Sequence, residues 1–317
     1  MSTVQLFAGS DHYKKIARGA VVTIGNFDGV HLGHQELLKS VIECAQRKKI
    51  SSCVFTFEPS PRTLLSKKNK SKRIGRWADK IKWLEKLGIE QIILEPFSIA
   101  FAQHSAEWFV EEILIKRLKT QVLFVGHDFR FGRARSGDVL LIKRLAPHIQ
   151  VHQLSAFKIQ DQIVSSSLIR ELISKGEVSR VAELLGRPHM VHGVVVGGDQ
   201  RGRKIGFPTA NIESDTEILP AAGVYLVSVS VNYGELYWGM ANLGIQPTFG
   251  ENKFRVEVNI FDFDKSIYGA DINIYFLEYM RSEQYFASVE QLKNQLSEDE
   301  KKARQTLQKY KLSKSIK

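Results

Sequence analysis

Two histidines, His31 and His34, stand three residues apart in the stretch GNFDGVHLGH (25–34). The strand-like run VVTIG precedes this stretch and a helical pattern of apolar residues follows it, so the pair lies where a strand turns into a helix. The first turn of a helix carries unpaired N–H groups and a partial positive charge, which together favour anions. Gly33 lets a phosphate approach the backbone closely. The pattern therefore predicts a phosphate contact by both imidazoles at a helix that begins near Gly33 or His34.

Two other interpretations of this pair remain open. Histidines three or four residues apart can share a zinc ion, but apart from Asp28 no carboxylate or cysteine stands nearby as an obvious third ligand. The histidines can also be ordinary core or surface residues, since an imidazole has many structural uses.

The stretch VSSSLIR (164–170) offers a second set of phosphate-binding groups. Its hydroxyls, from Ser165, Ser166 and Ser167, precede a predicted helix, and Arg170 is expected within the first turn. Hydroxyls and one guanidinium at a helix start can hold phosphate oxygens. An ordinary serine N-cap explains one of these serines but not all three.

A cationic loop is predicted after a later strand, in VGHDFRFGRARSGD (125–138). Its three arginines, Arg130, Arg133 and Arg135, lie among glycines, and a flexible lid of this kind would screen a polyphosphate. A solvated surface loop is the competing interpretation.

The stretch GGDQRGRKIGFPTANIE (197–213) combines glycines with basic residues. Glycines allow backbone amides to wrap a phosphate, and the Thr209 hydroxyl and the Asn211 amide are oxygen ligands of the kind that Mg²⁺ prefers. The spacing is not that of a Walker loop. A tight turn between strands is the alternative, but it does not explain the basic side chains of Arg201 and Lys204 beside the glycines.

Glu257 is the candidate proton acceptor of the second half of the chain. Along a strand its side chain would share one face with Arg255 and Asn259, opposite the apolar Val256 and Val258. A carboxylate on this polar face can take a proton from a substrate hydroxyl. An exposed strand glutamate without a catalytic role is the alternative.

Up to about residue 155 the chain alternates strand-like and helical patterns. Strands are predicted at 20–25, 51–57, 91–95, 121–126 and 149–154. Helices are predicted over 37–45, 78–88 and 105–118. This alternation predicts a parallel sheet with helices on both faces, which binds its ligands at the carboxyl ends of the strands.

Beyond about residue 186 helical periodicity disappears for some hundred residues. The runs VHGVVVGG, GVYLVSVSV, ELYWGMANLG, FRVEVNIFDF and DINIYFLEYM, separated by Gly, Asn and Asp turns, predict an antiparallel barrel. A closing helix is expected after Ser288, which forms a capping box with Gln291. The domain boundary is expected between Gly186 and Pro188.

Composition restricts the class of protein. The 317 residues suffice for two domains, and 43% hydrophobic and 25% charged residues are typical of a folded globular chain. The two cysteines suit a reducing compartment. The N-terminal residues lack the pattern of a secretory signal, and no stretch approaches the roughly 20 apolar residues of a membrane helix. We therefore expect a cytoplasmic location and no membrane partner.

The net charge of +11 is concentrated in two segments, 66–76 and 301–317. Clustered Lys and Arg attract polyanions, but such runs are commonly solvated loops or helix ends. Since no recognised nucleic-acid-binding module accompanies the charge, we expect no nucleic-acid partner.

The stretch 25–34 resembles the HxGH signature of the nucleotidyltransferase superfamily. FTFEPSP (55–61), 125–138 and VSSSLIRELI (164–173) resemble, in order and spacing, the adenylyltransferase half of bacterial bifunctional riboflavin kinase/FAD synthetases. The stretch 197–213 resembles the riboflavin kinase motif of the same family, and the segments that follow keep the family's order to the closing helix.

This resemblance implies two domains and two reactions. Residues 1–186 would form an α/β, Rossmann-like nucleotidyltransferase domain with a parallel sheet, and residues 187–317 a riboflavin kinase domain built as a six-stranded antiparallel β-barrel with a closing helix. The kinase would convert riboflavin to FMN with Mg²⁺ and ATP. The other domain would convert FMN and ATP to FAD and pyrophosphate. The resemblance implies no oligomeric state.

The resemblance also assigns roles to residues. His31 and His34 would bind the triphosphate and stabilise charge at the α-phosphate, and Asp128 and Phe129 occupy positions where the family contacts its ligands. The implied nucleotide-binding residues of the first domain are Gly25, Asn26, Phe27, Asp28, His31, Gly33, His34, Asp128, Arg130, Ser165, Ser166, Ser167 and Arg170.

In the second domain Glu257 would be the kinase base, and Thr209 and Asn211 would hold Mg²⁺. The implied nucleotide- and flavin-binding residues are Gly198, Arg201, Gly202, Lys204, Gly206, Phe207, Pro208, Thr209, Asn211 and Arg281. If Arg281 is only a surface charge, Glu283 is its expected partner.

The chain departs from the family pattern at several positions. Ser60 and Asn259 stand where histidine is usual, Gln246 stands where arginine is common, and Ser266 where aspartate is frequent. The change at Ser60 motivates an alternative, a riboflavin kinase whose adenylyltransferase domain is weakened. A binding protein that regulates through flavin or nucleic acid at residues 66–76 is the alternative from another class.

Overall fold

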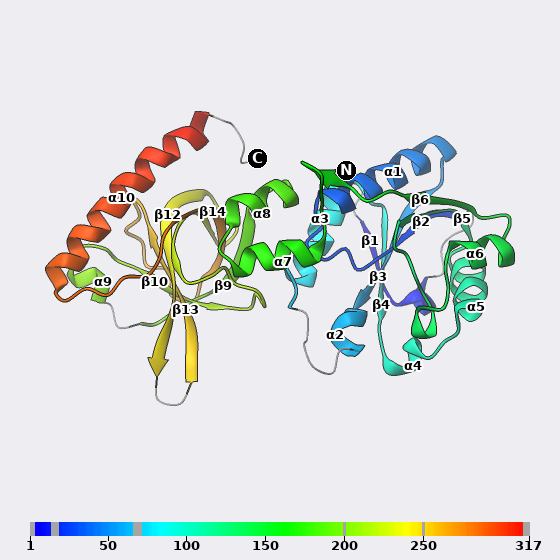
Figure 1. Ribbon diagram of the computed structural model, residues 1–317, viewed down its shortest axis with the longest axis horizontal. Coiled ribbons are helices and arrows are strands. Elements are labelled where there is room, and N and C mark those ends of the chain that lie inside the picture. The colour runs from blue at the N-terminus through cyan, green and yellow to red at the C-terminus, as the bar shows by residue number, and fades with distance from the viewer. Residues whose placement is uncertain (1–3, 14–18, 66–71, 199–200, 249–250, 313–317) are drawn as a thin grey trace. The chain divides into compact units, whose positions relative to one another are not determined.

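The computed structural model describes residues 4–13, 19–65, 72–198, 201–248 and 251–312 (Figure 1). Packing divides the chain into two compact units, 1–166 and 167–317, which are described separately. Within the described residues, no helix combines the length and apolar character needed to cross a membrane.

The first unit is built on a six-stranded parallel sheet with the strand order β1-β4-β3-β2-β5-β6. Its strands are β1 (Gln5–Ala8), β2 (Ala20–Ile24), β3 (Ser51–Glu58), β4 (Gln91–Pro96), β5 (Thr120–Gly126) and β6 (Gln150–Leu154). The five predicted strands and the parallel sheet are confirmed. The edge strand β1 escaped prediction because it is short and three of its four residues are exposed, which leaves no apolar alternation.

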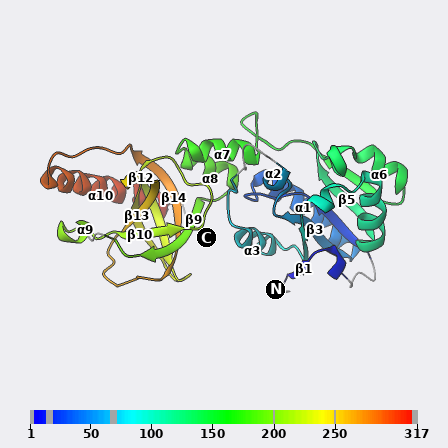
Figure 2. The ribbon, with the colours of Figure 1, turned by 90° about the horizontal axis from the view of Figure 1, so that it is seen from below.

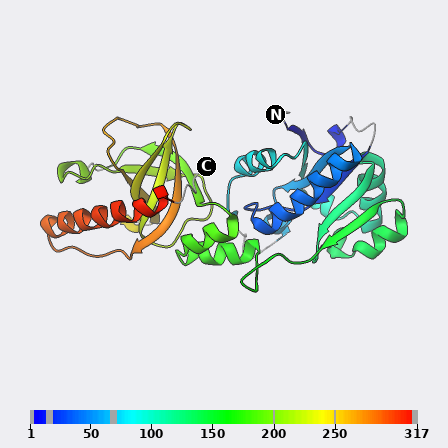
Figure 3. The same cartoon turned by 90° about the horizontal axis from the view of Figure 1, so that it is seen from above.

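Helices cover both faces of this sheet, as predicted. Alternate strand residues such as Val21 and Val54 pack on α1 (Leu32–Lys48) and α3 (Trp77–Leu87). Figure 3 shows α1 lying across the strands. The intervening strand residues pack on the other side, against a π-helical segment η2 (Phe109–Arg117) and α6 (Val139–Leu145).

The strand order reverses beside β2. From β2 the chain proceeds through β3 to β4 on one side, whereas β5 pairs with the other side of β2. In open α/β sheets the crevice at such a reversal is where ligands bind, outside the carboxyl ends of the strands. The segments that leave β2 and β5 at this crevice are 25–34 and 127–138, the two that the sequence singles out.

Short elements complete the first unit. They are η1 (Ser10–His12), α2 (Pro61–Leu65), α4 (Ile99–Ala102), α5 (Ala106–Trp108), η3 (Arg133–Arg135), β7 (Lys158–Ile159) and β8 (Gln162–Ile163). The predicted helix over 105–118 is thus present as α5 followed by η2.

The second unit contains a closed antiparallel barrel with the order β10-β13-β12-β11-β14-β9, which confirms the prediction (Figure 2). Its strands are β9 (His189–Val196), β10 (Ala210–Ser214), β11 (Gly223–Val231), β12 (Leu236–Thr248), β13 (Glu251–Ile260) and β14 (Asp271–Arg281). Its helices are α7 (Ser166–Ser174), α8 (Val178–Leu185), α9 (Arg201–Lys204) and α10 (Val289–Leu312). The strand β10 was hidden within the motif 197–213.

The closing helix α10 is held at its start and along its length. Ser288 Oγ accepts the Gln291 N–H at 3.2 Å, and the Gln291 side chain accepts the N–H of Ala287 at 3.1 Å. The predicted capping box is therefore present, with its return bond one residue earlier than expected. Further along, Ala303 and Leu307 pack against apolar residues of the barrel.

The buried His189 is expected to make the stability of the barrel depend on pH. Burial and, to a smaller extent, the charge of Arg187 lower the pKa of its imidazole to about 4, although the Ile218 carbonyl oxygen, 3.4 Å from Nε2, acts in the opposite direction. The unfolded chain therefore binds a proton near pH 6.5 that the folded barrel takes up only near pH 4. The free energy of unfolding is therefore unaffected by His189 above pH 6.5. It decreases as the pH falls from 6.5 to 4, by at most about 3 kcal/mol. Urea unfolding from pH 7 to 4 should show a shallower decline in His189→Gln, and an unchanged decline would contradict the prediction.

Candidate active sites

The first candidate site is the start of α1, where the two histidines meet. His31 is the N-cap residue, and its Nδ1 accepts the backbone N–H of His34 at 3.3 Å. The two rings stack with their centroids 3.6 Å apart. The helix therefore begins at Leu32, slightly before the predicted start, because the imidazole of His31 satisfies an N–H of the first turn. The structure brings both imidazoles to one helix N-terminus, as the sequence predicted.

The described residues do not support a zinc site at this pair. Among them, no group of three or more His, Cys, Asp or Glu side chains could hold a metal ion. The nearest candidate, Asp28, accepts the Ile74 N–H at 3.1 Å with its carboxylate. Asp28 therefore braces the loop before the helix.

The backbone of the loop from Gly25 to Val30 is held by hydrogen bonds from side chains outside the loop. Phe27 and Val30 adopt φ values of 49° and 41°, which residues with a side chain rarely do. The Asp28 carbonyl accepts the Ser166 hydroxyl at 3.0 Å, and the Val30 carbonyl accepts the Gln35 amide at 2.9 Å. These contacts fix a strained turn next to the histidines.

Gly33 is required by close packing in the first turn of α1. A Cβ at this position would lie 3.2 Å from the Cβ of Phe157 and 3.3 Å from the ring of His31. A larger residue would therefore push against the histidine that caps the helix.

The serines of 165–167 divide between the two units. The helix α7 begins at Ser166, so Arg170 lies in its second turn and not, as predicted, in the first. Ser166 bonds to the loop carbonyl of Asp28 within the first unit, whereas Ser167 and Arg170 belong to the second unit. Joint phosphate binding by these residues stays a prediction.

The loop after β5 is braced by its own side chains. Arg130 donates to Asp138 at 2.8 Å, and Asp138 also caps α6 by accepting the Leu141 N–H at 3.0 Å. The hydrogen bond from Leu141 and the charge of Arg130 lower the pKa of the Asp138 carboxyl. Arg135 donates to the Asp128 carbonyl at 3.4 Å, and Asp128 itself is exposed. Arg130 is thus paired in this structure.

An aromatic cluster lies at the carboxyl ends of β3 and β4, and the sequence reasoning missed it. Phe57, Phe97 and Phe101 form three mutual ring contacts with centroids 5.5 to 6.1 Å apart. His104 stacks on Trp108 next to Phe101, with centroids 3.6 Å apart. All but the exposed His104 are half-buried. The available signal was the number of aromatic residues after two predicted strands.

Ser60, which replaces a usual histidine, has a structural role at the end of β3. Its Oγ accepts the Thr63 N–H at 3.2 Å and lies 2.9 Å from the Thr63 hydroxyl oxygen, so it caps the short helix α2.

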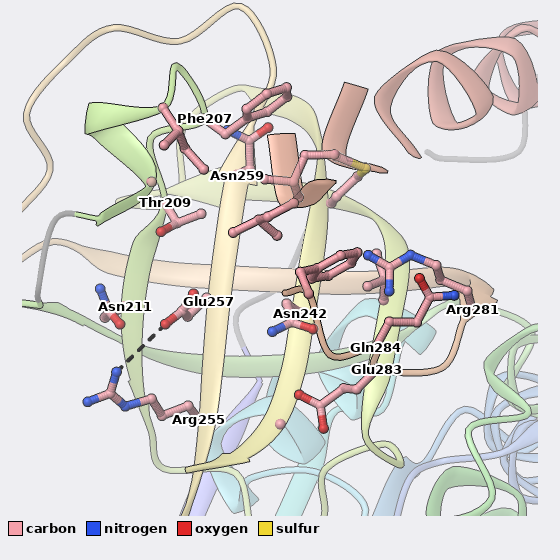
Figure 4. A pocket seen from close by; sticks show the side chains of 18 residues that line it. Phe207, Thr209, Asn211, Asn242, Arg255, Glu257, Asn259, Arg281, Glu283 and Gln284 are labelled. Atoms are coloured by element: carbon pink, nitrogen blue, oxygen red, sulfur yellow. Dashed lines mark ion pairs between the residues drawn. The ribbon is translucent and has the colours of Figure 1, made fainter. Parts of the chain in front are cut away.

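The second candidate site is a cavity of about 430 Å³ on the outer wall of the barrel (Figure 4). Val256 and Val258 are buried in the barrel core, whereas Arg255, Glu257 and Asn259 line the cavity. The predicted alternation along β13 is therefore confirmed. The polar part of the lining includes Thr209, Asn211, Asn242, Glu257, Arg281 and Glu283.

Glu257 lies between two amide side chains. The barrel register places it opposite Asn211 on β10 and opposite Asn242 on β12. Arg255 Nη1 lies 3.8 Å from its carboxylate, as the dashed line in Figure 4 shows. Asn242 was not predicted, although its alternation with the buried Ala241 and Leu243 marks it as outward-facing.

The glycine-rich segment packs against this wall. A Cβ on Gly198 would lie 2.0 Å from the Asn211 amide nitrogen, and one on Gly202 would lie 2.2 Å from the Phe207 carbonyl oxygen. The Asn259 amide donates to the Pro208 carbonyl at 2.7 Å. The residue that replaces the usual histidine therefore holds the backbone next to Thr209, just before β10 begins.

Other predicted residues of this segment are only partly described. Gly206 has a φ of 89°, a conformation that favours glycine. The segment contains the short helix α9 where a loop was predicted. The side chains of Arg201 and Lys204, like that of Gln246, lie outside the described residues.

Arg281 lines the cavity and attaches the closing helix. Its guanidinium donates to both oxygens of Asp299 on α10, with the shortest contact 2.7 Å from Nη2. Asp299 is only 4% exposed. The expected alternative partner, Glu283, was wrong, because the buried pair joins strand β14 to a helix that is distant in sequence.

Comparison with known proteins agrees with this two-site arrangement. The FAD synthetase family model matches residues 13–168, and the riboflavin kinase family model matches residues 185–307. Bifunctional riboflavin kinase/FMN adenylyltransferases are similar over most of their length. The protein of Haemophilus influenzae is 36% identical, covering 93% of this chain and 97% of that protein, and the Bacillus subtilis protein is 36% identical, covering 96% and 97%.

A solved structure is similar over nearly the whole chain. It is a crystal structure described as a macrolide-efflux protein from Streptococcus pneumoniae, with a TM-score of 0.87, 33% identity, and coverage of 95% of this chain and 99% of that one. Since relatives at 36% identity match over more than nine-tenths of their length, and the two family models match in succession, the chain belongs to the family of bifunctional riboflavin kinase/FMN adenylyltransferases.

Proposed function

We propose that this chain makes FAD from riboflavin in two steps at two separate sites. In the second unit, a riboflavin hydroxyl attacks the γ-phosphorus of ATP and gives FMN and ADP. In the first unit, the phosphate of FMN attacks the α-phosphorus of a second ATP and gives FAD and pyrophosphate. The observation that carries the proposal is the presence of two unlike sites, a histidine pair at a helix N-terminus and a carboxylate in a polar cavity.

For the kinase step, Glu257 is the proposed proton acceptor. It stands in the cavity wall between Asn211 and Asn242, which hold its surroundings polar. Phosphoryl transfer needs little covalent help beyond an aligned hydroxyl, a group that takes its proton, and charge stabilisation at the phosphate. Glu257 supplies the second of these requirements.

Thr209 and Asn211 are the proposed magnesium-binding residues. Both line the same cavity as Glu257, and both offer uncharged oxygen atoms. Mg²⁺ commonly takes one or two protein oxygens and completes its shell with water and substrate phosphates, so this small donor set fits it. The bound ion would neutralise charge on the β- and γ-phosphates.

For the adenylyl transfer, His31 and His34 are proposed to contact the α-phosphate. The attacking phosphate of FMN is already ionised near neutral pH, so this step requires charge stabilisation more than a base. The N-terminus of α1 adds its partial positive charge on the same side. Gly25, Asn26 and Phe27 would line the nucleotide from the loop.

The aromatic cluster is the proposed contact for the flavin ring of FMN. Phe57, Phe97 and Phe101 are half-buried at the carboxyl edge of the sheet, where ligands of such folds bind. A flat aromatic ring system packs favourably against aromatic side chains.

We place both reactions in the cytoplasm. Both cysteines, Cys44 and Cys53, are buried free thiols, which suits a reducing compartment.

The alternative of a kinase with a weakened adenylyltransferase is not favoured. The FAD synthetase family model matches residues 13–168, and Ser60 lies inside the matched segment.

A two-step assay tests the proposal. The purified chain is incubated with ATP and Mg²⁺ and either riboflavin or FMN, and flavins are separated by chromatography. We expect FMN and FAD from riboflavin, FAD from FMN, and neither product when EDTA removes the metal. Formation of FMN without FAD would show that the chain has only the kinase activity. No product from either flavin would refute the proposal.

A further inference from the structure

Lys80 is a half-buried lysine to which the reactions above assign no role. It lies on α3, and its ammonium donates to the Asn26 carbonyl at 3.3 Å and to the Thr56 hydroxyl oxygen at 3.2 Å. The Thr56 hydroxyl in turn donates to the same carbonyl at 3.3 Å, and Thr56 is fully buried. Two elements distant in sequence, β3 and α3, therefore converge on one peptide group of the loop before His31.

The charge of Lys80 is costly where it lies. Burial lowers the pKa of its ammonium, whereas the carboxylates of Glu58 and Asp28 oppose this effect and the guanidinium of Arg73 adds to it. Arg73 forms an ion pair with Glu58 at 2.8 Å, so the Glu58 carboxylate compensates the charge of Arg73 as well as that of Lys80. An apolar side chain of similar length would dock α3 without this desolvation penalty. The ammonium therefore points to a role beyond packing.

The contacted peptide group belongs to the loop that the proposed function gives to the nucleotide. The Asn26 carbonyl shares its peptide with the Phe27 N–H, and Phe27 has one of the loop's positive φ values. An ammonium on the carbonyl holds this peptide plane in place and, by polarising it, strengthens its N–H as a donor to an anion. Both effects depend on the lysine being charged.

We propose that Lys80 is a positioning residue of the adenylyl-transfer site, whose charged ammonium fixes the Asn26 peptide and so sets the loop that receives the triphosphate. This inference rests on the proposed function of the first unit. It requires no contact between Lys80 and the substrate.

Substitutions on one helix test the proposal. Lys80→Met removes the charge, Lys80→Arg keeps it, and Lys82→Met is the matched control on the exposed side of α3. We expect Lys80→Met to lower kcat/KM for ATP in FAD formation about 10- to 100-fold, the effect of a misplaced binding group. Lys80→Arg should retain most activity, and riboflavin phosphorylation should stay normal in all three. A Lys80→Met enzyme within twofold of the wild type in FAD formation would overturn the proposal.

A pH profile separates positioning from mere packing. Because burial lowers the pKa of Lys80, FAD formation by the wild type should fall on the alkaline side before an ordinary lysine would titrate. Lys80→Met should lack this decline. If Lys80→Met does not fold, Lys80→Arg carries the test, since arginine stays charged and must move the decline to higher pH. An unmoved decline overturns the proposal. A wild type that forms no FAD at any pH would instead refute the proposed function itself.

Discussion

Glu257→Gln is expected to lower the rate of riboflavin phosphorylation by about 10²- to 10⁴-fold, the usual contribution of a positioned proton acceptor. The amide keeps the size of the side chain and its place between Asn211 and Asn242, but it cannot take a proton from the substrate hydroxyl. Conversion of supplied FMN to FAD should proceed at the wild-type rate, because that reaction is assigned to the other unit. Initial rates with riboflavin and with FMN as separate substrates measure both effects.

Glu213→Gln is the matched control for this prediction. Glu213 is an exposed glutamate of the same barrel, on β10, and it does not line the cavity. Its substitution should leave both rates unchanged. Equal loss of the two activities in Glu257→Gln would show that the assignment is wrong, and so would full kinase activity.

His31→Ala is expected to reduce FAD formation by about 10²- to 10³-fold, the cost of removing one group that stabilises charge in the transition state. Phosphorylation of riboflavin should be spared, so that FMN accumulates when riboflavin is the starting flavin. Chromatography of the products with time gives both rates from one preparation.

His31 also caps α1, and the loss of its Nδ1 acceptor would cost about 1 kcal/mol of stability. His31→Asn separates the two roles, because asparagine is a favourable N-cap residue without an imidazole. We expect it to lose as much FAD formation as His31→Ala while keeping the stability of the wild type. Substantial FAD formation by His31→Asn would show that His31 only caps the helix and takes no part in adenylyl transfer.

The sequence predicted the fold where apolar periodicity was strong. The four central strands of the parallel sheet, β2 to β5, and the barrel strand bearing Val256 and Val258 bury one or both faces, so their patterns were distinct. β1 and β10 were missed for opposite reasons. β1 is an exposed edge with little apolar character, and β10 begins inside a motif whose glycines and basic residues dominate its appearance.

The candidate sites were predictable only where their residues are close in sequence. His31 and His34 share one helix turn, and Arg255, Glu257 and Asn259 share one strand face, so spacing alone placed them. The partner of Arg281 and the neighbours of Glu257 come from other strands and from α10, and such long-range pairings leave no local pattern. The role of Ser60 as a helix cap was equally hidden, because α2 is too short to show periodicity.

The position of the second cavity on the outer wall of the barrel has an evolutionary consequence. Along β13 the inward side chains pack in the barrel core, whereas the outward ones line the cavity. Residues of the cavity wall such as Arg255 and Asn259 can therefore be substituted without repacking the interior. Selection for a new acceptor and selection for a stable fold therefore act on alternate residues of the same strand.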